Sequence, residues 1–520
     1  MQTKTPRMKN ISKTILLASI AATALNMGAV CEASNSIKVP RCQSEDTEKI
    51  VTPQYWEKWT PEVRKKIDAD IEKNRKADAV VNLGEAAPGG DVKVEQLKHD
   101  FIFGAHIFNF NQLGAHEYNE RYKRAYGELF NSATVPFYWS DFETQPGRPR
   151  FVEEYRDTEE FWNNCKNPKD QRHWRRPATD PIVEFCNKKG IRAHGHPLVW
   201  TGFFAWWIYL EEIPKEKLAL YRKVNRDKKP GVYPFQKLTQ EQAEEMFGTV
   251  GETIREITER RFKQIAQRYG NRIQSWDVVN ESQKDYIAGV LIPGTRVTRS
   301  HIGLLQGDYA FHAFNAAQKY LPTDVALNIN DYICAEKYAE QIAELEKRGA
   351  RIDITGVQEH VFNYREPKKI MAGESFISPE ALLKRLNDTA KSGHKIHISE
   401  VTITGNDDSP KSRARQALYA ENQYRLWFSY PNVMGITWWN TVDDCGMKNE
   451  PSHSGIFTRD MQPKPVYHVL DNLINKEWKT NLTVKPDSDG KISFRGFRGT
   501  YKISWKDKYG RDRQMLYHLK

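Results

Sequence analysis

The chain has 520 residues, of which 12% are aromatic, with 14 tryptophans and a formal net charge of +11 at pH 7. This length suits one large α/β barrel with a smaller appendage. The charge includes a basic cluster at residues 172–176 but comes without a nucleic-acid-binding motif, which argues against a nucleic-acid partner. A solvated basic face is the simpler interpretation of the cluster, and an acidic polymer as partner is the alternative.

Residues 1–33 are typical of a secretory signal peptide. Four basic residues lie between Lys4 and Lys13, and the apolar run from Ile15 to Leu25 is too short to span a bilayer. We predict cleavage after Ala33 and a secreted or periplasmic protein. Cys31 could carry a lipid anchor, but the bulky Val30 precedes it, so we disfavour lipidation. No later segment is apolar enough to cross a membrane.

The cysteines that would remain do not form a recognisable framework. They are an odd, scattered set, namely Cys42, Cys165, Cys186, Cys334 and Cys445. None belongs to a Cys-x-x-Cys metal pattern, and we expect at most one disulfide among them.

Residues 34–100 and 478–520 are expected to flank the main domain. The first segment has a charged amphipathic helix at 61–76 and two short strands at 79–83 and 92–97, which we predict to form a hairpin around Pro88-Gly89-Gly90. The second has short strands separated by Asp/Gly turns. Because neither segment can bury its own faces, we predict that they pair into a small β-sandwich appendage.

Residues 101–477 contain eight strand–helix units. The expected strands are 101–105, 133–138, 191–200, 276–280, 325–330, 353–358, 396–400 and 434–439. Right-handed parallel crossovers close such a series into an α/β (β/α)8 TIM barrel. An open doubly wound sheet is the alternative, but no Gly-x-Gly-x-x-Gly opens the first helix, so a dinucleotide site is not indicated.

Two of these strands stop on a glutamate. The fourth ends in Asn280-Glu281 and the seventh ends in Glu400. In a parallel barrel both carboxyl groups would reach the same rim, and two facing carboxyl groups are what glycoside hydrolysis requires. Asn280 and Glu281 would alternate in a regular strand, so both reach the rim only if the strand ends or bulges there.

The motifs around these residues resemble those of one enzyme family. They are the run Trp-Asp-Val-Val-Asn-Glu at 276–281, Gly-His-x-Leu-Val-Trp at 195–200 and, more weakly, Asn-Asp-Tyr at 330–332 and Gln-x-His at 358–360. From about Phe101 to Leu470 the chain resembles glycoside hydrolase family 10, the retaining endo-β-1,4-xylanases. The resemblance implies that Glu281 is the general acid/base, that Glu400 is the nucleophile, and that xylan or a related plant polysaccharide is the substrate.

The same resemblance implies the residues that bind the sugar. Asn280 would hold the 2-hydroxyl, and Trp439 would stack on a ring. The others would line the subsite of the attacked sugar, namely His196, Trp200, Gln358 and His360. Of Trp438 and Trp439, we expect one to be a core residue. No metal and no cofactor is implied.

The chain departs from the family pattern beside the second strand. Where the family usually carries Glu-Asn followed by Lys-Trp, this chain has residues 135–140, Val-Pro-Phe-Tyr-Trp-Ser. The neighbouring sugar subsite is therefore expected to be apolar and aromatic, with Phe137, Tyr138 or Trp139 offering a stacking face. The basic loop 172–176, if it overhangs this rim, would favour a uronic-acid branch on a decorated glycan.

Two rival functions remain. The first is a non-catalytic sugar-binding protein, against which the intact Glu281 and Glu400 argue. The second is a metal-dependent amidohydrolase, which would place its His-x-His pair on the first strand rather than on the third, where His194 and His196 stand. Asn406-Asp407-Asp408 could bind a cation, but we favour a solvated turn.

Overall fold

The structure is a computed structural model that describes residues 49–84, 90–203, 205, 207, 239–289, 291, 297–299 and 304–520. The predicted signal peptide, Cys31 and Cys42 lie outside the described residues. Within these residues, no helix is both long and apolar enough to cross a bilayer. The cysteines of the described part are free thiols, namely Cys165, Cys186, Cys334 and Cys445.

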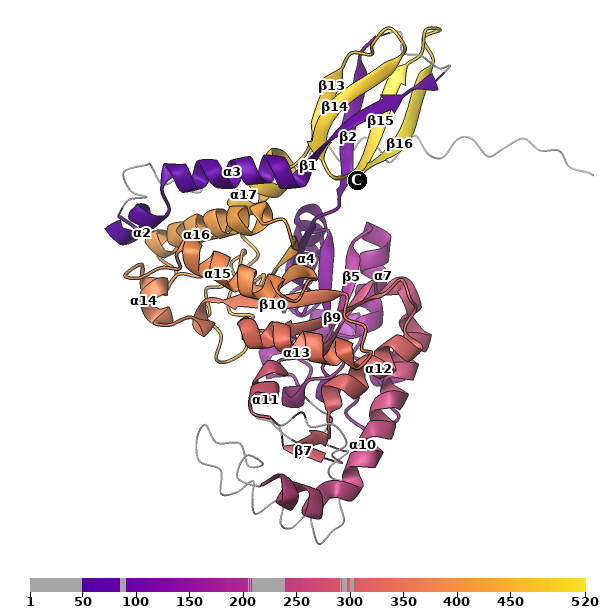
Figure 1. Cartoon of the computed structure of the whole chain (residues 1–520), viewed down its shortest axis with the longest axis vertical. Helices are drawn as coiled ribbons and strands as arrows, with labels where there is room; N and C mark the ends of the chain where they lie inside the picture. Colours follow the sequence, from indigo (N-terminus) through magenta and orange to yellow (C-terminus); the bar gives the residue numbers. More distant parts are fainter. Residues whose placement is uncertain are drawn as a thin grey trace, which may run out of the picture. The chain divides into compact units, whose positions relative to one another are not determined.

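The centre of the fold is a closed barrel of eight parallel strands (Figure 1). Around the barrel they are β3 (Ile102–His106), β4 (Ser132–Pro136), β5 (Arg192–His196), β6 (Ser275–Asn280), β9 (Ala326–Asp331), β10 (Ile354–His360), β11 (Lys395–Thr402) and β12 (Val433–Trp438). Each coincides with a predicted strand to within a few residues, so the predicted (β/α)8 barrel is confirmed. Nearly every residue of these strands is buried, as expected for parallel strands covered on both faces.

Amphipathic helices cover the barrel. In α13 (Glu336–Lys347), for example, Tyr338, Ile342 and Leu345 recur on one helical face and are all buried. The other outer helices are α4 (His116–Leu129), α7 (Thr179–Lys189), α10 (Gln240–Tyr269), α12 (Tyr309–Tyr320), α15 (Pro379–Ala390), α16 (Pro410–Ser429) and α17 (Pro465–Asn472). A further helix, α3 (Pro61–Arg75), packs on α16 (Figure 1), which explains why α16 is buried on most of its surface.

The terminal strands form the predicted β-sandwich. β1 (Lys76–Asn82) pairs with β14 (Lys491–Phe497) in one sheet. The other sheet has the order β13-β2-β15-β16, with β13 (Asn481–Val484), β2 (Val92–His99), β15 (Gly499–Lys506) and β16 (Asp512–Leu519). Apolar side chains from both sheets, including Val81, Val94, Ile492 and Ile503, form one core between them.

The predicted hairpin between residues 79 and 97 is wrong. β1 and β2 lie in different sheets and pair with C-terminal strands instead of with each other. The physical reason is that Val81 and Val94 each need an apolar partner across the sandwich, whereas an isolated two-stranded hairpin is at best marginally stable. Residues 85–89 of the predicted turn lie outside the described part of the chain.

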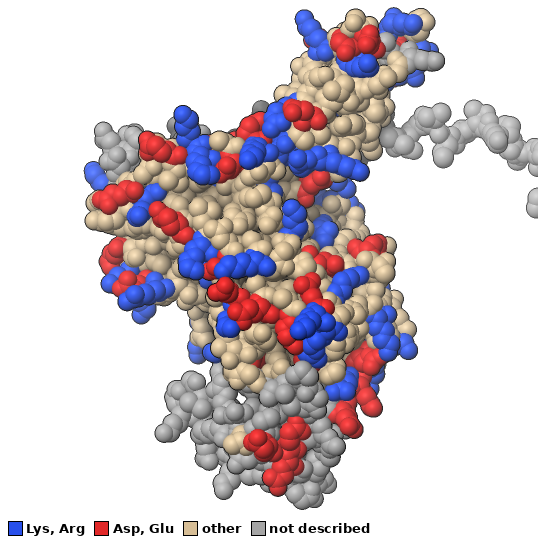
Figure 2. All heavy atoms as spheres, viewed as in Figure 1, with Lys and Arg blue, Asp and Glu red and all other residues tan. Residues whose placement is uncertain are grey.

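The connections on the side of the strand tips hold short elements. The long loop after β4 contains α5 (Trp139–Phe142) and α6 (Glu159–Asn164), and β6 is followed by α11 (Gln283–Ile287) and the small β7 (Val297–Arg299) and β8 (Leu304–Gln306) pair. The remaining short helices are α2 (Pro53–Lys58) and α14 (Pro367–Ala372). Basic and acidic side chains are interspersed on the face shown in Figure 2.

Candidate active site

The tip of β6 carries both Asn280 and Glu281 to the barrel rim. The pairing of β6 with β9 shifts register between Asp277 and Val279, which is a bulge. The strand then ends at Asn280, and Glu281 takes a left-handed backbone conformation with φ 58°. Such a φ is uncommon for a residue with a side chain and is often found at functional sites. The expectation that this strand ends or bulges here is confirmed.

The Glu281 carboxyl group is half-buried and lies between an indole and an amide. Its Oε2 accepts a hydrogen bond from Trp200 Nε1 at 3.1 Å, and its Oε1 accepts one from Gln358 Nε2 at 3.2 Å. Burial, and secondly the charge of Glu400, raise the pKa of Glu281 to about 7. A carboxyl group that keeps its proton near neutrality can act as a general acid.

The Glu400 carboxylate has a different environment. Its Oε1 accepts a hydrogen bond from Asn330 Nδ2 at 2.8 Å and lies 3.9 Å from His196 Nε2. Its Oε2 lies 3.1 Å from His360 Nε2. Donors therefore converge on both oxygens, an arrangement that suits an anionic nucleophile.

His196 is backed by a buried carboxylate. Its Nδ1 lies 2.7 Å from Asp277 Oδ2, which is also 2.9 Å from His194 Nε2. Burial alone would raise the pKa of Asp277, but the two imidazoles lower it well below its usual value. For His196, burial has the opposite effect and would lower the pKa. The hydrogen bond to Asp277 and the charge of Glu400 nevertheless raise the pKa of His196 above its usual value. His194, left out of the predicted site, thus belongs to this buried chain.

Asn280 is oriented by two amides. Its Oδ1 accepts hydrogen bonds from Asn330 Nδ2 at 2.9 Å and from Gln358 Nε2 at 3.3 Å. Asn330 begins the Asn-Asp-Tyr motif at 330–332 and contacts both Asn280 and Glu400, but it is not among the predicted site residues. Its position at the tip of β9 was the signal in the sequence that could have identified it.

Aromatic rings form one wall of the site. The Trp439 ring lies 5.4 Å from that of His196 and 6.0 Å from that of His360, and the Tyr138 ring lies 5.4 Å from that of His196. Trp438 is instead fully buried and donates to Asn440 O, so one of the two tryptophans is a core residue, as predicted. In the altered run 135–140, Phe137 and Trp139 also belong to the core, so Tyr138 is the aromatic residue of this run that lines the pocket.

These side chains enclose a pocket of about 280 Å³. All eight predicted site residues line it, namely His196, Trp200, Asn280, Glu281, Gln358, His360, Glu400 and Trp439. Tyr138 from the altered run 135–140 and Arg175 and Arg176 from the basic loop 172–176 also line it, together with five residues that the sequence did not assign to the site, namely Tyr332, Phe362, Asn363, Met447 and Glu450.

The interpretation of residues 172–176 as a solvated basic face is wrong for its last two members. Arg175 and Arg176 are only 1% and 6% exposed. Arg175 pairs with Glu450 at 3.2 Å. Burial would raise the pKa of Glu450, but the charge of Arg175 is the main cause that lowers this pKa to about 2. The Arg176 guanidinium stacks 3.7 Å from the centre of the Tyr138 ring. Ion pairing and stacking offset the cost of burying these charges.

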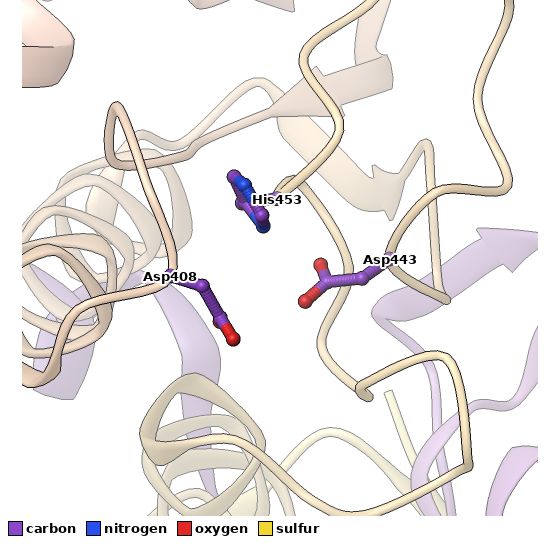
Figure 3. A group of neighbouring side chains, drawn as sticks. All are labelled: Asp408, Asp443 and His453. Atoms are coloured by element: carbon purple, nitrogen blue, oxygen red, sulfur yellow. The ribbon is translucent and has the colours of Figure 1, made fainter.

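Two aspartates and a histidine form a second cluster with the ligand types of a cation site. Ligand atoms of Asp408, Asp443 and His453 all lie within 4.8 Å of one another (Figure 3). Asp408, however, accepts two hydrogen bonds from Arg413, at 2.7 and 2.8 Å, and Asp443 pairs with Lys464 at 3.0 Å. Both carboxylates are therefore already neutralised by cations, and we assign no metal to this cluster.

The fold and the site together define the class of protein. A closed parallel barrel with two carboxyl groups at its strand tips, one with its pKa raised to about 7 and the other surrounded by donors, has the arrangement of a glycoside hydrolase. The sequence profile described as glycosyl hydrolase family 10 matches residues 158–473, which is more than half of the chain. The chain therefore belongs to glycosyl hydrolase family 10.

Three relatives illustrate the likeness. The chain is 24% identical over 311 residues to an endo-1,4-beta-xylanase/feruloyl esterase of Xylanibacter ruminicola, covering 54% of this chain and 36% of that protein. It is 23% identical over 325 residues to the anti-sigma-I factor RsgI6 of Acetivibrio thermocellus, covering 62% of this chain and 34% of that protein. It is 25% identical over 316 residues to endo-1,4-beta-xylanase B of Paenibacillus barcinonensis, covering 55% of this chain and 78% of that protein. The chain thus spans about a third of the length of the first two relatives.

Proposed function

We propose that this protein is a retaining endo-β-1,4-xylanase that hydrolyses xylan-type polysaccharide by double displacement. The observation that carries the proposal is the contrast between the surroundings of the two carboxyl groups. The pKa of Glu281 is raised to about 7, whereas Glu400 accepts from Asn330 and lies against two imidazoles. Family membership and relatives named as xylanases support the choice of substrate.

In the first step, Glu281 donates its proton to the glycosidic oxygen while Glu400 attacks the anomeric carbon. The C–O bond to the leaving sugar breaks, and a glycosyl ester forms on Glu400. In the second step, Glu281, now a carboxylate, takes a proton from water. The water oxygen attacks the anomeric carbon, and Glu400 leaves as a carboxylate.

The remaining residues bind the attacked sugar. We assign the 2-hydroxyl to Asn280, because a hydrogen bond there can strengthen in the transition state. Trp439 offers a stacking face, and four other residues line the same subsite, namely His196, Trp200, Gln358 and His360. Trp200 and Gln358 also contact the Glu281 carboxyl group and would aim its proton.

The proposal is tested by incubating the purified protein with a panel of plant glycans, with and without EDTA, and by analysing the products. We expect xylo-oligosaccharides from xylan at the same rate in both conditions. Binding without cleavage would support the non-catalytic sugar-binding alternative, and loss of activity in EDTA would support a metal-dependent hydrolase.

We also propose a preference for xylan that carries uronic-acid branches. Tyr138, from the run 135–140 that replaces polar residues usual in the family, lines the pocket together with Arg176, and a guanidinium can pair with a carboxylate. We expect a higher kcat/KM on glucuronic-acid-substituted xylo-oligosaccharides than on unsubstituted ones. Arg176→Gln should reduce the kcat/KM on the substituted oligosaccharides roughly 10- to 150-fold, since a charge-assisted hydrogen bond contributes about 1.5–3 kcal/mol.

Two controls isolate the carboxylate. Oligosaccharides whose uronic acid has been reduced to the alcohol should be cleaved equally by the wild type and Arg176→Gln. Arg148→Gln changes an exposed arginine of the same loop and should alter neither value. A clear wild-type preference for unsubstituted oligosaccharides would contradict the proposed specificity without affecting the proposed reaction.

Finally, we propose that residues 1–33 are removed and that the enzyme is secreted or periplasmic. The basic start and the apolar run that follows support this. Mass spectrometry of the protein from its native host should show a chain that begins near residue 34, and a chain that retains residues 1–33 would contradict the proposal.

A further inference from the structure

The two imidazoles that contact Glu400 are supported by different chemical groups. Behind His196, Nδ1 faces the Asp277 carboxylate at 2.7 Å. Behind His360, Nδ1 faces the Thr402 hydroxyl at 2.8 Å, while Nε2 lies 3.1 Å from Glu400 Oε2. All of these side chains are buried.

The barrel register brings Thr402 to this position. β10 and β11 shift register between Val357 and Gln358, and beyond this irregularity His360 lies opposite Thr402. Thr402 follows Glu400 by two residues on the same strand, so both side chains project from the same face of β11. The β-branched threonine has a stiff χ1 angle, which holds its hydroxyl in one direction.

The Thr402 hydroxyl can donate a hydrogen bond to His360, which a carboxylate cannot do. An ionised Glu400 can only accept, so its contact with His360 Nε2 is a hydrogen bond only in forms of His360 that carry a hydrogen on that nitrogen. A neutral imidazole protonated on Nε2 has an unprotonated Nδ1, which must accept. The Thr402 hydroxyl can donate to that nitrogen, whereas the Asp277 carboxylate facing His196 can only accept.

The His360 ring itself is held by another contact. The Phe362 ring stacks on it with centres 4.6 Å apart and planes 11° from parallel. This stacking supports the plane of the imidazole, and the Thr402 hydroxyl then acts on which ring nitrogen carries the proton.

We propose that Thr402 is a positioning residue that holds His360 as the neutral tautomer protonated on Nε2 and thereby directs one hydrogen bond at Glu400. This rests on the proposed function only in taking Glu400 as the nucleophile. His360 then donates to Glu400 Oε2 across 3.1 Å, while His196, backed by Asp277, lies 3.9 Å from Oε1.

The tautomer can be read without any measurement of activity. In the full-length protein with ¹⁵N-labelled histidine, and with the His360 signals assigned by their loss in His360→Gln, we expect Nε2 to be protonated and Nδ1 unprotonated. Thr402→Val has a similar shape but no hydroxyl and should mix the two tautomers. Thr402→Ser keeps the hydroxyl and should restore the wild-type spectrum, and Thr402→Asp should protonate both nitrogens.

Kinetics give the second readout. Thr402→Val should lower kcat on xylo-oligosaccharides roughly tenfold with little change in KM, because the lost support acts on the nucleophile rather than on sugar binding. Thr402→Ser should retain most of the activity. Wild-type ¹⁵N signals and kcat in Thr402→Val, or protonation of wild-type His360 on Nδ1 alone, would overturn the proposal. Neither result would bear on whether the protein is a xylanase.

Discussion

Glu400→Ala should lose nearly all turnover of xylo-oligosaccharides and regain it when azide is added. Without the carboxylate the glycosyl ester cannot form, and the loss should be roughly 10⁴- to 10⁶-fold, the range found when an enzymatic nucleophile is removed. Azide is small enough to occupy the space left by the side chain. It should attack the anomeric carbon from the face that Glu400 used and give an α-glycosyl azide, which NMR identifies.

The matched control for this experiment is Glu380→Ala. Glu380 is a glutamate whose side chain is 63% exposed, and its removal should leave activity unchanged. The thermal unfolding of Glu400→Ala should resemble that of the wild type, which separates loss of chemistry from loss of fold. Substantial turnover by Glu400→Ala without azide would show that another group is the nucleophile.

Glu281→Ala should show the second-largest effect, and its size should depend on the leaving group. Loss of general acid catalysis costs about 10²- to 10⁴-fold, so cleavage of xylan should fall by that factor. Aryl xylosides with acidic phenols need little protonation and should form the glycosyl ester at nearly the wild-type rate. Azide should then attack that ester and give a β-glycosyl azide, the opposite anomer to that from Glu400→Ala.

The same residue predicts how activity depends on pH. Because the pKa of Glu281 is raised to about 7, its acid form persists to neutrality and is lost as the pH rises through that value. The kcat/KM of the wild type on xylo-oligosaccharides should therefore fall on the alkaline side of about pH 7. This limb should be absent from Glu281→Ala acting on an activated aryl xyloside. An unchanged alkaline limb in that variant would assign the titration to another group.

The shared rim position of Glu281 and Glu400 could be predicted from the sequence because both lie at or near the C-terminal end of a buried strand. A carboxylate at the tip of a barrel strand has no role in the core, and the barrel topology alone places Glu281 and Glu400 at one rim. The prediction that one of the two neighbouring tryptophans is a core residue is also confirmed, and its physical basis is the geometry of a strand. Successive residues of a strand face opposite sides, so Trp438 and Trp439 cannot both point into the pocket.

Contacts between distant segments could not be predicted. β1 pairs with β14 more than 400 residues away, and no local pattern distinguishes that pairing from a hairpin. Arg175 and Arg176 lie at the end of a long loop without periodicity, so their burial depends on Glu450, from the loop after β12, and on Tyr138, from the start of the same long loop. The contact of Thr402 with His360 likewise could not be predicted, because it depends on the register shift that places the two residues opposite each other.

The measurement that tests the central claim most directly is the configuration of the first product. Wild-type enzyme and a xylo-oligosaccharide are mixed in an NMR tube, and the anomeric proton signals are recorded before mutarotation equilibrates them. Double displacement through Glu400 and Glu281 predicts that the new reducing end appears first as the β-anomer, with the α-anomer growing in later. Initial appearance of the α-anomer would mean single displacement by water and would contradict the mechanism proposed for this site.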